Sequence, residues 1–418
     1  MFKVNNIESH QVFDSRGFPT IATEVTLSCG SKGYSMVPSG ASTGQFEAFE
    51  LRDNDPVEFF GKGVKKALIQ IKSEISKSVI DKTFKTQADF DHALRASDSC
   101  QQFKNVGANS VLSLSKAFAK ATAYASKIEL FQKITFSKAF HLPVPLLNVI
   151  NGGAHANNNL SIQEFMIVPH GFNYFSDAMR AGCEIYQYLK HTLKQKGYST
   201  SVGDEGGFAP NFDSDEKVID LLLHAIQSCG YQPGSQVSIA LDVAASEFYD
   251  SNKYKTQTGS FETKKWVDYL VNLTKKYPIS SIEDPCADID EKGWKYILKE
   301  VPNSCKIVGD DLIVTQLPRL KHSFENKLAN AILIKPNQVG TITDTLDAIR
   351  FAKEKDFKVI VSHRSGDTED TFIADLAVAT QAHCIKAGAP CRSERLAKYN
   401  RLLWLEEKFD LELYRDEV

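Results

Sequence analysis

The segment VSIALD at residues 237–242 is a short apolar run that ends on a carboxylic acid. Five later segments repeat this arrangement and end on, or run into, a polar residue: ISSIE (279–283), KIVGD (306–310), AILIK (331–335), VIVSHRS (359–365) and HCIK (383–386). Runs of this length and composition are typical of parallel strands that are buried on both faces.

The spacing of these segments predicts a closed α/β barrel. The steps from Asp242 to Glu283, Asp310, Lys335 and His363 are 41, 27, 25 and 28 residues, close to the roughly 30 residues of a strand, a helix and the next strand. Parallel strands around a closed sheet bring their carboxyl ends to one mouth. We therefore expect three carboxylates and two lysines, distant in the sequence, to become neighbours there.

The chain of 418 residues is long enough for two domains, since an α/β barrel takes about 250 residues. We expect an N-terminal α+β domain over 1–135 and the eight-stranded barrel over 140–418, because Pro143 and Pro145 follow the last helical pattern. In the first domain, the patterns predict strands at 3–13, 20–29 and 34–37 and helices at 63–80, 86–95 and 109–124.

The composition excludes several classes of protein. A net charge of −3 and 24% charged residues describe an ordinary globule without a general surface for nucleic acid. The polar start and the lack of a run of ~18 apolar residues predict no standard export signal and no membrane span, and hence a cytoplasmic protein. Eight cysteines without a Cys-x-x-Cys pair are too dilute for a disulfide framework, so we assign them no chemistry.

Asp242, Glu283 and Asp310 predict a metal site. Three carboxylates at one mouth would repel each other unless a hard divalent cation lay between them. Mg²⁺ prefers oxygen ligands, whereas zinc would more often show histidine or cysteine. A single acid at a strand end is more often the cap of the next helix, but three at successive strand ends favour the metal.

Lys335 and Lys386 end two further strands at the same mouth. A neighbouring cation disfavours protonation of a lysine, so either could serve as a base. The residues alone leave a salt bridge or a Schiff base open, although the three acids argue against the Schiff base.

Candidate acids and hydrogen-bonding groups precede these strands. Glu205 lies in the glycine-flanked loop GDEGG, and Gln163, Glu164 and His155 come before it. Each alone would be an ordinary loop or structural residue; together they supply groups for acid and base catalysis.

The segment PSGASTG at 38–44 combines two hinge glycines with the hydroxyl of Ser39. Glycines allow a loop to open and close, and a serine oxygen can bind a metal or phosphate. We expect either a lid or an ordinary surface loop.

These motifs resemble those of the enolase family, the phosphopyruvate hydratases. The resemblance runs over nearly the whole chain and rests on DSRG (14–17), SGASTG (39–44), QEFM (163–166), GDEGG (203–207), DVAAS (242–246), IEDP (282–285), KPNQ (335–338) and HRSG (363–366). It implies a β3α4 N-terminal domain, a barrel with an atypical ββαα opening, and a homodimer or larger assembly. It also implies two magnesium ions per site, the second of which binds with the substrate.

The resemblance also implies a role for each candidate residue. Lys335 would remove the C2 proton of 2-phosphoglycerate, and Glu205 would be the acid at the departing C3 hydroxyl. The first magnesium would bind Asp242, Glu283 and Asp310, and the second would bind Ser39 of the lid. The rest of the pocket would comprise Arg364 and Ser365 as phosphate contacts, with Gln163, Glu164, His155, His363 and Lys386.

Three positions depart from the family pattern. Phe18 stands where Asn is usual, Ala154 where Ser is common, and Asp367 where Glu is usual. None is a proposed catalytic group, so the departures bear on loop packing or on the subunit contact.

Two other functions remain open. One is a superfamily racemase or cycloisomerase of a carboxylate without phosphate, against which Arg364, Ser365 and Ser39 argue. The other is a surface or scaffold role, with plasminogen or an RNA-processing assembly as partner. The sequence given ends Asp416-Glu417-Val418, without the terminal lysines that plasminogen binding often uses.

Overall fold

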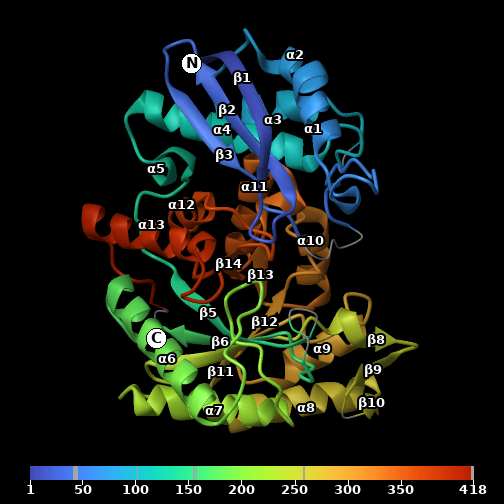
Figure 1. The fold of residues 1–418 in the computed structure, drawn as a ribbon, viewed down its shortest axis with the longest axis vertical. Helices are drawn as coiled ribbons and strands as arrows, with labels where there is room; N and C mark the ends of the chain where they lie inside the picture. The colour runs from blue at the N-terminus through green and yellow to red at the C-terminus, as the bar shows by residue number, and fades with distance from the viewer. Residues whose placement is uncertain (41–45, 101, 154–155, 157, 258, 416–418) are drawn as a thin grey trace.

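The computed structural model describes residues 1–418 except 41–45, 101, 154–155, 157, 258 and 416–418. Its buried apolar side chains form two clusters, one within residues 4–121 and one within 119–413. Figure 1 shows the N-terminal part of the chain, coloured blue to teal, above the barrel and its helices.

The N-terminal part is a sheet of four strands in the order β3-β2-β1-β4. The strands are β1 (Phe2–Phe13), β2 (Pro19–Leu27), β3 (Lys32–Met36) and the short β4 (Thr83–Phe84). The predicted hairpin of β1 and β2 is confirmed. The third strand begins two residues before the predicted one, and β4 was missed because two residues carry no periodicity.

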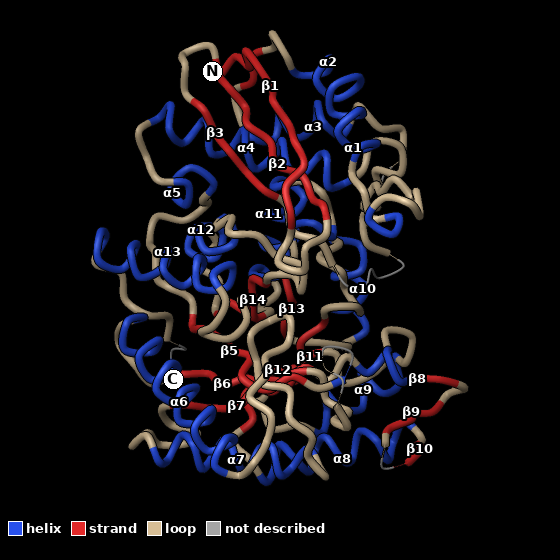
Figure 2. The backbone as a smooth tube through the Cα atoms, in the orientation of Figure 1, coloured by secondary structure: helices blue, strands red, loops and turns tan. Residues whose placement is uncertain are grey.

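Helices cover this sheet (Figure 2). They are α1 (Lys65–Gln70), a π-helical turn (Ile71–Ile75), α2 (Ser76–Val79), α3 (Gln87–Arg95), α4 (Ala108–Ser126) and α5 (Leu130–Ile134), with a 3-10 turn at Phe59–Gly61. The first three follow one another directly and match the predicted helix at 63–80. A Cβ on Gly33 of β3 would lie 2.1 Å from the carbonyl oxygen of Ala117, so glycine permits the close approach of α4.

The C-terminal part is a closed barrel with the strand order β11-β12-β13-β14-β15-β5-β6-β7. In chain order the strands are β5 (Val144–Asn151), β6 (Glu164–Pro169), β7 (Val237–Asp242), β11 (Ile279–Glu283), β12 (Lys306–Gly309), β13 (Ala331–Ile334), β14 (Lys358–Ser362) and β15 (Cys384–Lys386). All six strands expected from the apolar runs are present.

Helices surround the barrel: α6 (Phe175–Gln195), α7 (Asp215–Ser228), α8 (Thr263–Lys276), α9 (Glu291–Glu300), α10 (Leu317–Asn326), α11 (Ile342–Glu354), α12 (Phe372–Ala379) and α13 (Ser393–Phe409). Strands β5 and β6 precede α6 and α7, and β6 runs antiparallel to both neighbours. The barrel therefore opens ββαα.

The long first step in the strand spacing has a structural cause. Between β7 and α8 the chain forms a 3-10 turn (Ala245–Phe248) and a small sheet of β8 (Tyr249–Asp250), β9 (Lys253–Thr256) and β10 (Gly259–Phe261). This sheet projects at the right of Figure 1.

Asp370 fixes the N-terminal part over the barrel. Its carboxylate accepts the backbone N–H of Met36 in β3 at 2.9 Å and the ammonium of Lys120 in α4 at 2.9 Å. It also accepts the N–H of Phe372 at the start of α12. The two parts are thus joined next to the loop that follows β14.

Across the described ranges, no helix combines the length and the apolar character needed to span a membrane.

Candidate active site

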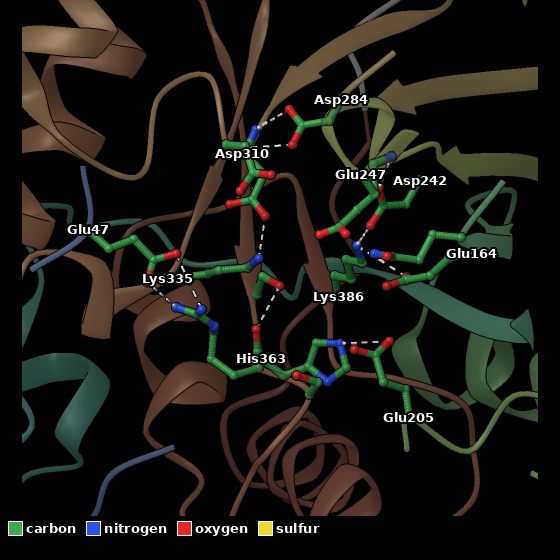
Figure 3. A pocket seen from close by; sticks show the side chains of 16 residues that line it. Glu47, Glu164, Glu205, Asp242, Glu247, Asp284, Asp310, Lys335, His363 and Lys386 are labelled. Carbon is green, nitrogen blue, oxygen red and sulfur yellow. Dashed lines mark hydrogen bonds and ion pairs between the residues drawn. The ribbon is translucent and has the colours of Figure 1, made fainter. Parts of the chain in front are cut away.

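The carboxyl ends of the barrel strands surround one pocket, shown in Figure 3. Ten of the predicted site residues line it: Gln163, Glu164, Glu205, Asp242, Asp310, Lys335, His363, Arg364, Ser365 and Lys386. Glu283 joins them through an ion pair with Lys386, 2.8 Å from its ammonium. The strand ends therefore converge on one pocket, as the spacing of the segments predicts.

Lys386 lies among three carboxylate side chains. Its ammonium is 2.8 Å from Asp242 and 3.1 Å from Glu164. Burial would lower the pKa of Lys386, but Asp242, Glu164 and Glu283 outweigh it and hold that pKa well above its usual range. In this structure Lys386 therefore forms salt bridges with the neighbouring carboxylates, which is one of the alternatives that the sequence leaves open.

Lys335 forms an ion pair with Asp310. The backbone N–H of Lys335 donates to Thr315 Oγ1 at 2.9 Å, and Gln338 Nε2 donates to Asp310 at 3.1 Å. Burial would lower the pKa of Lys335, but Asp310 raises it overall. The carboxylate of Asp310 therefore holds the Lys335 side chain at the mouth of the barrel.

Glu205 and His363 face each other across the pocket, with Nε2 of His363 3.5 Å from Oε2 of Glu205. The guanidinium of Arg395 has only donors and donates to Nδ1 of His363, so the neutral imidazole carries its proton on Nε2. Burial lowers the pKa of His363 to about 4. Asn148 Nδ2 also donates to Glu205, at 3.0 Å. Both groups orient the Glu205 carboxyl.

Arg364 is held by two acceptors. Its Nη1 donates to Glu47 at 3.0 Å and to Asn337 at 3.0 Å. Glu47 comes from the N-terminal part and was not predicted as a site residue. Its only signal in the sequence is its place three residues after the SGASTG segment.

Ser39 is fully buried and does not line the pocket. Its hydroxyl donates to Asp14 at 2.6 Å, and its backbone pairs with Gly366, the neighbour of Ser365. His155 and residues 41–44 of the expected lid lie outside the described residues.

The donor set suits a hard divalent cation. The described lining contains eight carboxyl groups and three cationic side chains: Glu47, Glu164, Glu205, Asp242, Glu247, Asp284, Asp310 and Asp311 against Lys335, Arg364 and Lys386. Burial and neighbouring acids raise the pKa of Glu283 well above its usual value and that of Asp311 to about 7. Such crowding of oxygen donors without sulfur fits Mg²⁺.

Sequence reasoning missed Asp284, Asp311 and Glu247, although two of them form acid pairs with predicted ligands, Glu283-Asp284 and Asp310-Asp311. Oxygens of Asp284, Asp310 and Asp311 lie within 4.8 Å of one another. However, the two Asp284 oxygens accept the backbone N–H groups of Asp310 and Asp311 at 3.0 and 2.9 Å. Asp284 therefore orients the turn after β12, and its neighbours are better placed to bind a cation.

Comparison with known proteins shows the family of the chain. The model of the enolase C-terminal TIM barrel domain matches residues 139–414, and that of the enolase N-terminal domain matches 4–134. The chain is 50% identical to a protein named enolase from Ehrlichia canis (strain Jake) over 408 residues, 98% of this chain and 97% of that one. It is 50% identical to an enolase of Ehrlichia ruminantium (strain Gardel), over 97% of this chain and 96% of that one. An enolase of Ehrlichia chaffeensis (strain ATCC CRL-10679 / Arkansas) is 48% identical, over 97% of this chain and 96% of that one. With both of its parts matched, the chain belongs to the enolase family.

Proposed function

We propose that this chain is a lyase of glycolysis that interconverts 2-phosphoglycerate and phosphoenolpyruvate by removal and addition of water. The observation that carries the proposal is that Lys335 and Glu205, a base and an acid, line one pocket together with the guanidinium of Arg364. The name of the relatives, enolase, supports the same reaction.

Lys335 acts as the neutral amine: its nitrogen takes the C2 proton of the substrate, and the ammonium that forms pairs with Asp310. Glu205 gives a proton to the C3 hydroxyl as that group departs. Asn148 and His363 hold the carboxyl of Glu205 in place for this step. A positioned acid or base of this kind contributes about 10² to 10⁴-fold to the rate.

Asp242, Glu283 and Asp310 are the proposed ligands of a first magnesium ion, and Ser39 of a second. The two ions would neutralise the negative charge that develops on the substrate carboxylate when the C2 proton leaves. Ser39 has to exchange its hydrogen bond to Asp14 to reach a metal. We assign Ser39 to a lid that moves when substrate binds.

Arg364 and Ser365 are the proposed phosphate contacts. The guanidinium offers paired donors that match phosphate oxygens. The remaining wall comprises Gln163, Glu164, His155, His363 and Lys386, of which Glu164 has a pKa well above its usual value because of burial and of Glu205.

We also propose a division into domains at 1–135 and 140–418. The two buried clusters support it, with one qualification: Leu130, Phe131 and Ile134 of α5 pack in the cluster of the barrel. A homodimer is proposed from the exposed aromatic side chains of Tyr34, Tyr124 and Trp404. The substrate, a phosphorylated metabolite, supports a cytoplasmic place of action.

The test is the absorbance of phosphoenolpyruvate when the purified protein meets 2-phosphoglycerate. We expect product in the presence of magnesium and none after chelation, with activity restored when the ion is added back. Failure to form phosphoenolpyruvate at any magnesium concentration by a folded protein contradicts the proposal.

A further inference from the structure

A fully buried arginine lies beside the candidate active site without lining its pocket. Arg395 belongs to the first turn of α13, and its side chain has no solvent exposure. Charged side chains are almost never fully buried unless they are paired. The residues proposed to bind or convert the substrate do not include this arginine.

The two terminal nitrogens of Arg395 reach two loops at once. Nη1 donates to Nδ1 of His363 and to the carbonyl of Arg364 at 2.6 Å. Nη2 donates to the carbonyl of Ser365 at 2.7 Å and to that of Asp204 at 3.1 Å. The guanidinium therefore joins the segment after β14 to the loop that carries the candidate acid.

The side chain of Arg395 is also fixed along its length. Its Nε lies 3.3 Å from Oε1 of Glu394. A Cβ on Gly388 would lie 2.8 Å from Cδ of Arg395, so the glycine leaves room for the methylene chain. A guanidinium is a planar fork of donors, and the compact ammonium of a lysine could not meet the same set of acceptors.

The contact with Nδ1 decides which group the imidazole of His363 offers to the pocket. A guanidinium has no acceptor, so Nδ1 accepts and Nε2 carries the proton of the neutral ring. Figure 3 shows Nε2 facing Glu205, at 3.5 Å. With the proton on Nδ1 instead, Nε2 would present a lone pair to the carboxylate and could not orient it.

The main chain of the Glu205 loop is held from the same side. The carbonyl of Asp204 accepts from Arg395, and the carbonyl of Glu205 accepts the backbone N–H of Ala389 at 2.9 Å. Both donors belong to the part of the chain that follows β15. The position of the candidate acid is therefore tied to Arg395 through its backbone as well as through His363.

We propose that Arg395 is a positioning residue for the acid step: it holds His363 with Nδ1 as an acceptor and Nε2 protonated, and it fixes the loop that presents Glu205. The kinetic consequence rests on the proposed function, whereas the form of the imidazole does not. Lys335 ends β13 and pairs with Asp310. The base step should therefore depend on Arg395 much less than the acid step.

The first measurement is nitrogen NMR of the full chain with labelled histidine and no substrate. The signal of His363 is assigned as the one that His363→Gln removes. We expect an unprotonated Nδ1 and a protonated Nε2. In Arg395→Met the Nδ1 signal should move, because this nitrogen loses its charged donor. Lys398→Met should leave that signal in place.

The second measurement compares the two proton transfers in the same variants. Arg395→Met should lower formation of phosphoenolpyruvate ~10-fold or more, because a hydrogen bond to a charged group contributes about that factor. Exchange of the C2 hydrogen with deuterated water should fall much less. The matched control is Lys398→Met. Lys398 is equally buried on α13, and its ammonium donates to Asp367 at 3.1 Å and to Glu394 O at 2.6 Å. Its loss should leave the ratio of the two rates unchanged.

Arg395→Lys provides a variant that keeps the buried charge, should Arg395→Met fail to fold in thermal unfolding. It should regain only part of the elimination rate, because an ammonium cannot hold both loops.

Three outcomes overturn the proposal: a proton on Nδ1 of His363 in the unchanged protein, an equal fall of exchange and elimination in Arg395→Met, or full elimination by Arg395→Lys. If the unchanged protein forms no phosphoenolpyruvate, the proposed function fails. The NMR signal of His363 then still decides whether Arg395 sets the form of the imidazole.

Discussion

Arg364 of the barrel and Glu47 of the N-terminal domain form an ion pair across the domain boundary, with Nη1 of Arg364 3.0 Å from Oε2 of Glu47. Both side chains are buried, and Glu47 raises the pKa of Arg364 against the effect of burial. The group proposed to bind phosphate is therefore oriented by a residue that the barrel does not contain.

Glu47→Gln should weaken substrate binding more than it slows turnover. The amide keeps the shape of the side chain but loses the charged partner of Arg364, and a charged hydrogen bond contributes about 1.5–3 kcal/mol. We expect KM to rise ~10-fold or more in steady-state kinetics, with a smaller change in kcat. Glu129→Gln is the control: it removes a carboxylate that pairs with Arg401 at 2.8 Å, far from the pocket, and should leave KM unchanged. An equal rise of KM in both variants would mean that domain contact in general, and not Glu47, sets substrate affinity.

Glu283→Gln or Asp310→Asn should remove nearly all activity and leave the fold intact. Each change keeps the side-chain volume but removes a charged oxygen ligand, which Mg²⁺ requires. Calorimetry should show at least ~10-fold weaker magnesium binding, while circular dichroism stays as in the unchanged protein. Glu247→Gln is the control, because Glu247 lines the same pocket but is exposed. Normal turnover of either variant at low magnesium would contradict the ligand assignment.

Ser39→Ala should lower turnover and weaken magnesium binding in the presence of substrate, and leave magnesium binding to the free protein almost unchanged. The proposed ligands of the first ion are all on the barrel, whereas Ser39 is on the N-terminal domain. The control is Ser35→Ala, which removes a hydrogen bond of 2.6 Å to Ser113 O in the same domain. Both variants should lose about 1 kcal/mol of stability, but only the first should change the magnesium dependence of the rate. Loss of the first magnesium in calorimetry of free Ser39→Ala would refute this assignment.

Lys335→Ala and Glu205→Gln should separate the two proton transfers. Without its base, Lys335→Ala should neither exchange the C2 hydrogen with deuterated water nor form phosphoenolpyruvate. Glu205→Gln keeps the shape and hydrogen bonding of the side chain without the proton donor, so it should retain exchange while elimination falls by ~10² or more. Mass spectrometry of recovered 2-phosphoglycerate reads the exchange. Normal exchange by Lys335→Ala together with none by Glu205→Gln would reverse the two roles.

Lys116 should make the stability of the protein depend on alkaline pH. Burial lowers its pKa to about 8 in the folded protein from an ordinary 10.5, despite the ion pair with Asp370 at 3.2 Å. Between these two values the unfolded chain binds the extra proton, so stability rises with pH, by on the order of 3 kcal/mol in total. Relative to Lys116→Met, the protein should therefore gain stability from pH 8 to 10.5 in urea unfolding. A difference that stays constant over this range would show that Lys116 keeps its ordinary pKa.

Much of the barrel could be predicted from the sequence. Segments such as VSIALD are mostly apolar, without a polar residue at every second position, because both faces of the strand are buried, and their spacing leaves room for one helix between strands. The polar residue that ends each segment is therefore at the mouth. The predicted group of acids and lysines follows from local pattern and chain topology alone.

The partners of these residues were decided only by the tertiary structure. Asn148 on Glu205, Glu47 on Arg364, and Asp14 on Ser39 are contacts between segments that no periodicity relates, two of them within or across the N-terminal domain. The contact of Glu47 with Arg364 depends on how the domain docks on the barrel, and the other two depend on the packing within each part. The sequence by itself determined which residues end the strands, because that is a local property of the chain. The tertiary structure decided which charged side chains meet, because only closure of the barrel and docking of the domain set the distances between them.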